Sequence, residues 1–166
     1  MPRIKNADFA DLPIIHDLAQ RIWPYAYGEL LSTGQLKYML EKIYSLPSLQ
    51  NQFNVLKHSF ILVFCNDLPV GFASYSPNDH DAVTYRLHKI YVLPGQQGTG
   101  AGKLLLEHVV NRSKLSGALF LELNVNRFNK ARLFYERHGF AIVGEEDIDI
   151  GGGYFMNDYV MNLALA

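Results

Sequence analysis

The segment from Gln97 to Lys103, with the sequence QGTGAGK, constrains the fold of this chain more than any other. It follows residues 87–93, which are rich in β-branched and aromatic side chains, and precedes residues 104–110, whose apolar residues recur at helical spacing. A glycine-rich turn that opens a helix directs several free backbone N–H groups toward one point, and the helix dipole adds partial positive charge there. Because glycine accepts positive φ and lets a ligand come close, the segment predicts a strand–loop–helix unit that binds a phosphate-bearing ligand.

Two common nucleotide-binding patterns do not fit this segment. The dinucleotide fingerprint has the spacing G-x-G-x-x-G, whereas the glycines here lie at positions 98, 100 and 102. The mononucleotide P-loop has a glycine where this chain has Gln97, and a serine or threonine where it has Leu104. The pattern that fits is Q-x-x-G-x-G, formed by Gln97, Gly100 and Gly102. A glycine-rich turn without a ligand is the alternative interpretation.

Length and composition favour one globular domain. The chain has 166 residues, of which 49% are hydrophobic and 13% aromatic, so it can bury a sizeable core. Its net charge of −1, from 15 basic and 16 acidic residues, argues against the strongly basic surface of nucleic-acid-binding proteins. Cys65 is the only cysteine, which excludes an intrachain disulfide. Because the N-terminus lacks an apolar signal segment and no apolar run has transmembrane length, we expect a cytoplasmic protein without membrane or nucleic-acid partners.

The spacing of apolar residues predicts an α+β, or mixed α/β, chain with helices early, antiparallel strands in the middle, a β-α-β-α unit and a final hairpin. Asp8 or Asp11 caps a first helix that ends near Trp23, and Ser32 opens a second helix through a capping box with Gln35. The expected strands cover residues 3–5, 60–65, 70–75, 84–93, 118–125, 140–150 and 154–163. The remaining expected helices begin at residue 47, run from the glycine segment to residue 115, and cover residues 129–138.

A second motif lies downstream of the glycine segment. Residues 129–140 are similar to the pattern N-x-x-A-x-x-x-Y-x-x-x-G-F, although Asn129 stands one residue too close to the alanine. The positions in register are Ala131, Tyr135, Gly139 and Phe140. Together with Q-x-x-G-x-G and the order of elements, this motif resembles the GNAT superfamily of N-acetyltransferases over nearly the whole chain. Residues 87–92 and 153–161 also look like those of bacterial polyamine acetyltransferases.

The resemblance implies one N-acetyltransferase domain over residues 1–166, with a central, mostly antiparallel twisted sheet flanked by helices. It implies acetyl-CoA as co-substrate and direct transfer to an amine in a ternary complex. Backbone groups of Tyr91, Val92 and Leu93 would pair with the pantetheine arm as an added strand does, and Asn129 would contact the same arm.

The same resemblance assigns the pyrophosphate to backbone N–H groups of the glycine segment. The residues concerned are Gln97, Gly98, Thr99, Gly100, Ala101, Gly102 and Lys103. Arg132 would reach the 3′-phosphate of the cofactor, or else lie solvated on its helix. The Lys103 side chain could likewise be simply exposed.

Acetyl transfer needs a neutral amine and a proton donor for the leaving thiolate. Tyr135 is the expected general acid, with aromatic packing as the alternative. Arg86 stands where many relatives carry a glutamate, and an arginine cannot serve as a base. The candidates for the base are His88, which strand alternation places on the same face as Arg86, and Glu122 on the neighbouring strand. Each could also be an ordinary strand residue. The histidines show no metal-ligand spacing, so we expect no metal.

The acceptor is the least constrained part of the prediction. A polyamine or another small primary amine is the first hypothesis, and a protein N-terminus or lysine is the second. An aromatic group could line an acceptor groove or belong to the core: Trp23, Tyr25, Tyr27 and Tyr44. Acidic residues that could favour a cationic amine are Glu29, Asp79, Asp81 and Asp158.

A GNAT-fold module that binds acyl-CoA or a partner without catalysis is the alternative function, and Arg86 favours it. A homodimer through the C-terminal strands is a further candidate, because dimers are common in the family.

Overall fold

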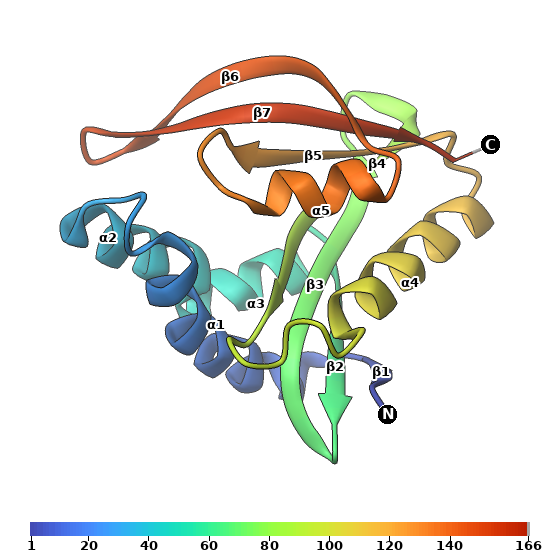
Figure 1. Ribbon diagram of the computed structural model, residues 1–166, viewed down its shortest axis with the longest axis horizontal. Coiled ribbons are helices and arrows are strands. Elements are labelled where there is room, and N and C mark those ends of the chain that lie inside the picture. Colours follow the sequence, from blue (N-terminus) through green and yellow to red (C-terminus); the bar gives the residue numbers. More distant parts are fainter. Residues whose placement is uncertain (166) are drawn as a thin grey trace.

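The computed structural model describes residues 1–165 and forms a mixed α/β fold around one seven-stranded sheet, in the order β1-β2-β3-β4-β5-β7-β6 (Figure 1). The strands are β1 (Arg3–Asn6), β2 (Ser59–Cys65), β3 (Leu68–Asn78), β4 (Asp81–Val92), β5 (Phe120–Asn126), β6 (Ala141–Gly151) and β7 (Tyr154–Ala164). The helices are the 3-10 turn η1 (Phe9–Asp11) and α1 (Leu12–Tyr27), α2 (Thr33–Tyr44), α3 (Leu46–Asn54), α4 (Ala101–Leu115) and α5 (Ala131–Arg137). The predicted order of elements is confirmed.

Helices α1 and α2 form as their sequences predict, with two differences. The expected apolar face of α1 is buried: Leu12, Ile15, Leu18 and Ile22. The helix continues through Pro24 to Tyr27, past the expected end, and the ring of Tyr27 packs on Trp23 of the same helix. Ser32 caps α2 by accepting a hydrogen bond from the Gln35 backbone at 3.1 Å. The Gln35 side chain does not complete the capping box, because it donates to the Phe155 carbonyl and so joins α2 to β7.

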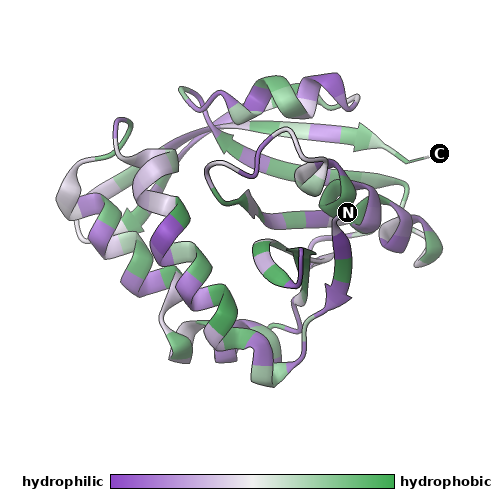
Figure 2. Cartoon of the chain, turned by 60° about the horizontal axis from the view of Figure 1, so that its bottom comes forward, coloured by the Kyte–Doolittle hydropathy of each residue, from purple (hydrophilic) through white to green (hydrophobic). Residues whose placement is uncertain are grey.

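Helices cover both faces of the sheet. On β4, Tyr91 packs against Trp23 and Tyr27 of α1, whereas the next residue, Val92, lies beside Gly102 of α4. Because successive strand residues point to opposite faces, α1 and α4 lie on opposite sides of the sheet. Figure 2 shows polar and apolar bands alternating along the helices, as expected for elements that bury one side only.

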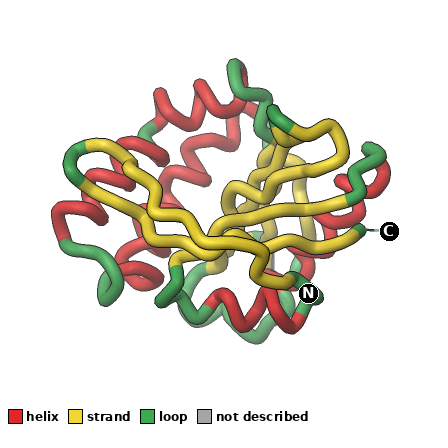
Figure 3. Tube along the Cα trace, turned by 90° about the horizontal axis from the view of Figure 1, so that it is seen from above, coloured by secondary structure: helices red, strands yellow, loops and turns green. Residues whose placement is uncertain are grey.

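The sheet is antiparallel except where β4 and β5 pair in parallel. The turn formers at residues 77–81 predict a loop, but β3 and β4 continue into this stretch and pair as far as Asn78 and Asp81. A β-bulge shifts the register of β3 and β4 between Ser74 and Tyr75, and His88 is the extra residue on β4. Seen from above, the β6–β7 hairpin extends across the molecule and forms one edge of the sheet (Figure 3). No helix among residues 1–165 is both long and apolar enough to cross a membrane.

Candidate active site

Strands β4 and β5 run side by side only briefly. Their parallel pairing covers three residue pairs and ends with Arg86 and Glu122. Beyond that point β4 continues along β3 and β5 continues along β7, so the halves at residues 87–92 and 123–126 are paired only on their outer sides. We call the space between these two halves the β4–β5 opening (Figure 1). An opening in a sheet exposes backbone groups that a ligand can pair with.

One residue on β4 presents such groups to the opening. Leu93 donates its N–H to the Val70 carbonyl at 2.8 Å, so its amide is already used on the β3 side. Because antiparallel strands bond through alternate residues, Tyr91 also turns its N–H and C=O toward β3. Val92 therefore turns its N–H and C=O toward the opening. Of the three residues predicted to pair with a pantetheine arm, Val92 has the required orientation.

The glycine segment lies at the end of β4 and starts α4. Gly98 and Gly100 adopt φ of 84° and 90°, a left-handed conformation that favours glycine. Gly100 is the N-cap of α4 and supplies no side-chain cap, and Leu104 makes the first intrahelical bond, to the Gly100 carbonyl at 3.0 Å. Residues 101–103 therefore keep N–H groups without an intrahelical acceptor, next to the positive end of the helix dipole. This arrangement agrees with the predicted anion site.

Tyr135 of α5 lies close to two tyrosines that reach the same region from other elements. Its ring packs edge-on against Phe134 and Phe140, at centroid distances of 5.6 and 5.7 Å. Within residues 1–165 the Tyr135 hydroxyl has no hydrogen-bond partner, whereas the hydroxyls of Tyr27 and Tyr91 lie 2.9 Å apart. Burial raises the pKa of Tyr135 well above its usual value, and the nearby Tyr27 contributes. Tyr135 is therefore protonated at neutral pH and free to donate.

The other predicted cofactor residues have partners of their own. The Asn129 side chain accepts the Ala131 N–H at 2.9 Å, which fixes the start of α5 and accounts for its close spacing to that residue. Arg132 forms an ion pair with Glu136 at 3.5 Å, and Lys103 is exposed and lies 3.8 Å from Glu107. Both cations are on the surface, where they can rearrange toward a phosphate.

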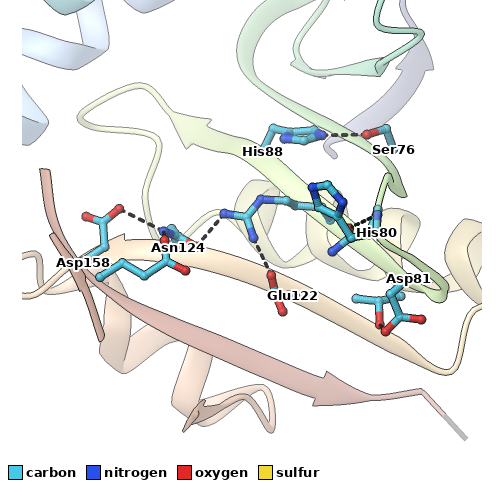
Figure 4. Close-up of polar contacts among 11 residues, drawn as sticks. Ser76, His80, Asp81, His88, Glu122, Asn124 and Asp158 are labelled. Carbon is cyan, nitrogen blue, oxygen red and sulfur yellow. Dashed lines mark hydrogen bonds and ion pairs between the residues drawn. The ribbon is translucent and has the colours of Figure 1, made fainter. Parts of the chain in front are cut away.

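Polar side chains of β4, β5 and β7 are linked in a row beside the opening, and we call it the polar row: Arg86, Glu122, Asn124 and Asp158. Figure 4 shows Glu122, Asn124 and Asp158 of this row. The Arg86 guanidinium donates to the Glu122 carboxylate at 2.6 Å and also to the Asn124 side-chain oxygen. The Asn124 amide nitrogen in turn lies 3.3 Å from Asp158. Glu122, one of the two predicted bases, is therefore already paired with a cation.

His88 lies on the same face as Arg86, as strand alternation predicts, but it is packed among other groups. Its Nε2 is 2.7 Å from the Ser76 hydroxyl (Figure 4). Its ring stacks on that of His58, with 3.9 Å between the ring centroids. Burial, with the nearby charges of His58, Lys89 and Arg86, lowers the pKa of His88 to about 2. A histidine in this setting is neutral and weakly basic, which argues for a packing role.

The aromatic candidates for an acceptor groove divide in two. Trp23, Tyr27 and Tyr44 are buried in the core between α1, α2 and the sheet, while Tyr25 is exposed. Asp81 accepts bonds from the Val83 N–H and the Thr84 hydroxyl, so it shapes the start of β4.

Comparison with known proteins shows the family and the fold of the chain. Residues 57–142 match the model of the acetyltransferase (GNAT) domain. Over 153 residues the chain is 39% identical to the [ribosomal protein bS18]-alanine N-acetyltransferase of Haemophilus influenzae, covering 92% of this chain and 85% of that protein. The chain belongs to the GNAT acetyltransferase family. An uncharacterized N-acetyltransferase of Mycobacterium tuberculosis is 40% identical over 93 residues, which span 55% of this chain and 58% of that protein.

The GNAT fold extends over the whole molecule. The PaiA N-acetyltransferase of Thermoplasma acidophilum, whose structure contains coenzyme A, superposes with a TM-score of 0.80 at 24% identity, covering 99% of each chain. That likeness supports the predicted fold.

Sequence reasoning did not anticipate two features of this GNAT site. Tyr91 was expected to act through its backbone, yet its side chain bonds to Tyr27, and no motif signals that pair. Asp158 was one of several acidic candidates, and only the pairing of β5 with β7 singles it out. Among residues 1–165 no group of three or more His, Cys, Asp or Glu side chains could hold a metal ion.

Proposed function

We propose that this GNAT protein transfers the acetyl group of acetyl-CoA directly to a primary amine in a ternary complex. The observation that carries the proposal is the proximity of three parts to the β4–β5 opening: Val92, the free N–H groups at the start of α4, and Tyr135, which lies near Tyr91 of β4 and whose hydroxyl has no partner among residues 1–165. When bound, acetyl-CoA would supply a thioester whose carbonyl carbon accepts the amine.

The chain's groups fit a pyrophosphate linked to an extended arm. The N–H groups of residues 97, 98 and 100–103 would hold the pyrophosphate, and Val92 would pair with the pantetheine amides. The Thr99 N–H, which the sequence also predicts for this role, already donates to the Gln96 carbonyl at 3.4 Å. Gly102 supports this assignment, because a Cβ built there would meet only ordinary contacts at 3.7 Å or more, so the protein's own packing does not demand a glycine. Close approach of a ligand gives a reason for the small residue.

Tyr135 would protonate the leaving sulfur. A phenol with a raised pKa holds its proton at neutral pH and can give it to a thiolate as the C–S bond breaks. Asn129 would contact the pantetheine arm, and Arg132 the 3′-phosphate. His88 and Glu122 are less suited to act as base, because one is weakly basic and the other is paired with Arg86.

The acceptor is proposed as a small primary amine such as a polyamine. A protein N-terminus is the second candidate, and the relationship to the Haemophilus enzyme, which is named for the alanine of ribosomal protein bS18, favours it. A cytoplasmic location, a single domain over the whole chain and a homodimer remain predictions.

Release of free thiol from acetyl-CoA would test the proposal, with putrescine, spermidine, amino acids, aminoglycosides, a lysine peptide and a peptide with N-terminal alanine as acceptors. We expect release above the acceptor-free background with one class. Protein that binds acetyl-CoA but releases no thiol with any acceptor would contradict the proposed transfer and favour a binding module.

A further inference from the structure

Asp158 of β7 is a buried carboxylate with an unused oxygen. The residue is 6% exposed, and Oδ2 lies 3.3 Å from the Asn124 amide nitrogen. Its Oδ1 is buried and has no hydrogen-bond partner among residues 1–165. Among the described residues no Lys, Arg or His nitrogen lies within 4.0 Å of this carboxylate. A buried carboxylate without a cation is costly, so the position calls for a ligand that supplies the missing donor.

The charges around Asp158 leave it available to a cation. Arg86 is held by Glu122 and Asn124, and Arg127 by Asp147 at 2.9 Å, while the Arg127 Nε donates to the backbone carbonyl of Asp158. Glu146, opposite Asp158 on β6, adds another negative charge. Burial raises the pKa of Asp158 and Glu146 raises it further, which outweighs the opposing effects of Asn124, Arg127 and Arg86.

The location of Asp158 links it to the reaction. In the sheet it lies opposite Asn126, the last residue of β5, at the edge of the β4–β5 opening. Its charge contributes to the raised pKa of Tyr27, whose hydroxyl bonds to Tyr91 and whose own presence raises the pKa of Tyr135. Asp158 therefore lies near the tyrosines around the proposed proton donor, on the face covered by α1.

We propose that Asp158 is a catalytic residue: its carboxylate receives the acceptor as an alkylammonium ion and takes up the proton that must leave before the nitrogen can attack. The inference rests on the proposed acetyl transfer and names its general base and its substrate class, a primary alkylamine that is cationic at neutral pH. Among the polar row and its neighbours in residues 1–165, Glu122 is paired with Arg86, His88 with Ser76, and Glu146 is exposed, which leaves Asp158 as the buried carboxylate with a free oxygen.

The protons balance as follows. The ammonium gives one proton to Asp158, and the nitrogen lone pair forms a C–N bond to the thioester carbonyl carbon. The C–S bond breaks, the sulfur takes the proton of Tyr135, and the second proton of the nitrogen restores that tyrosine. Asp158 then releases its proton to solvent. The products are the amide, the free thiol and one proton.

The variant Asp158→Asn tests the inference, with Asp149→Asn as a matched control that removes one carboxylate from the opposite face of the same hairpin, where the asparagine oxygen can still accept the Gly151 N–H. Calorimetric titration with acetyl-CoA should give wild-type affinity for both variants. With putrescine or an N-terminal alanine peptide as acceptor, kcat/KM of Asp158→Asn at pH 7 should fall by about 10²–10⁴-fold, the contribution of a general base. Asp149→Asn should stay close to wild type.

The pH profile separates a base from a structural residue. In the wild type kcat/KM should level off well below the pKa of the amine, because Asp158 removes the proton from the ammonium form. In Asp158→Asn only the free amine reacts, so kcat/KM should rise about tenfold per pH unit up to the amine pKa, near 8 for an α-amine and about 10.4 for a lysine-like amine. The defect therefore shrinks as pH rises.

Three results would overturn the inference while leaving acetyl transfer in place. They are an active Asp158→Asn with an unchanged profile, a defect of equal size at every pH, and a weakly basic aromatic amine such as p-anisidine being used as well as putrescine. If the variant does not fold, the wild-type profile decides, because a rise that continues to the amine pKa excludes a base. A wild type that acetylates no amine would instead overturn the proposed function itself.

Discussion

The two sides of the β4–β5 opening were not equally visible in the sequence. The proposed cofactor side is made by backbone N–H groups of one continuous segment, residues 97–103, whose glycines can be recognised in the sequence. The proposed acceptor side is made by side chains from β4, β5 and β7 that span more than seventy residues of sequence, and strand pairing alone places Arg86, Glu122 and Asp158 in one row. Figure 4 shows Glu122, Asn124 and Asp158 of this row. The comparison suggests that backbone chemistry is encoded locally, whereas side-chain chemistry depends on register.

The largest effect is expected from Gly100→Val, which tests whether the cofactor side depends on local backbone alone. A β-branched side chain at φ of 90° cannot keep the loop conformation, so acetyl-CoA binding should fall below detection by calorimetry. Gly117→Val is the matched control, because Gly117 has φ of 91° and open space around it at the far end of α4. Both variants should lose a similar ~1–2 kcal/mol of stability. Equal loss of binding in the two would show that the loop has no special role.

The second-largest effect is expected from Tyr135→Phe, which tests whether the Tyr135 hydroxyl takes part in acetyl transfer from the cofactor side to the acceptor side. Because that hydroxyl has no hydrogen-bond partner among residues 1–165, its removal should leave the folded state intact while kcat falls by about 10²–10⁴-fold. Acetyl-CoA affinity, measured by titration, should not change. Tyr75→Phe is the control, since both tyrosines are 7% exposed and Tyr75 belongs to β3. A Tyr135→Phe enzyme with wild-type turnover would remove the tyrosine from the chemistry.

Most of the fold follows from sequence patterns, and the exceptions have physical causes. The β-α-β-α unit with its glycine segment was predictable, because apolar spacing and turn glycines act within a few residues. The C-terminal end of α1 was not predictable from the sequence, because the packing of Tyr27 on Trp23 and Tyr91 stabilises the helix beyond Pro24. Propensity predicts a stop before proline, and tertiary contact overrides it.

The site was predictable to a smaller extent for the same reason. The predicted face of His88 is correct, since alternation is local, but its neutrality comes from burial and from the stacked His58, which lies in the loop before β2. The free oxygen of Asp158 depends on where β7 pairs with β5 and on which cations are already engaged. No spacing in the sequence carries that information.

Lys89 offers a third test, which asks how strand pairing changes the pKa of a lysine by burying it. It lies on the face of β4 covered by α2 and α3, where it is buried and donates to the Gln52 side chain at 2.6 Å. Burial lowers the pKa of Lys89 to about 7. The unfolded chain, with a lysine pKa of about 10.4, then binds more protons than the folded state between these two values. The free energy of unfolding should therefore rise with pH from about 7 to about 10, by at most about 1.4 kcal/mol per pH unit.

Urea unfolding across that pH range would measure the rise, and Lys89→Met should flatten it. Lys103→Met is the control, because that lysine is exposed on α4 and should leave the slope unchanged. A wild-type stability that does not depend on pH between 7 and 10 would contradict the burial of a neutral lysine.

The smallest effect is expected from Glu122→Gln, which compares the two carboxylates of the polar row, Glu122 and Asp158, as candidate bases. Glu122 is about a quarter exposed and paired with Arg86, so losing the pair should cost less than about 1 kcal/mol in urea unfolding. The glutamine oxygen can still accept from the guanidinium, which keeps Arg86 in place and away from Asp158. We therefore expect kcat/KM within a few-fold of wild type and an unchanged pH profile. A loss near 10²-fold that shrinks as pH rises would make Glu122 the base. The acceptor side would then depend on Glu122, which pairs with β4, and not on Asp158, which the pairing of β7 with β5 places there.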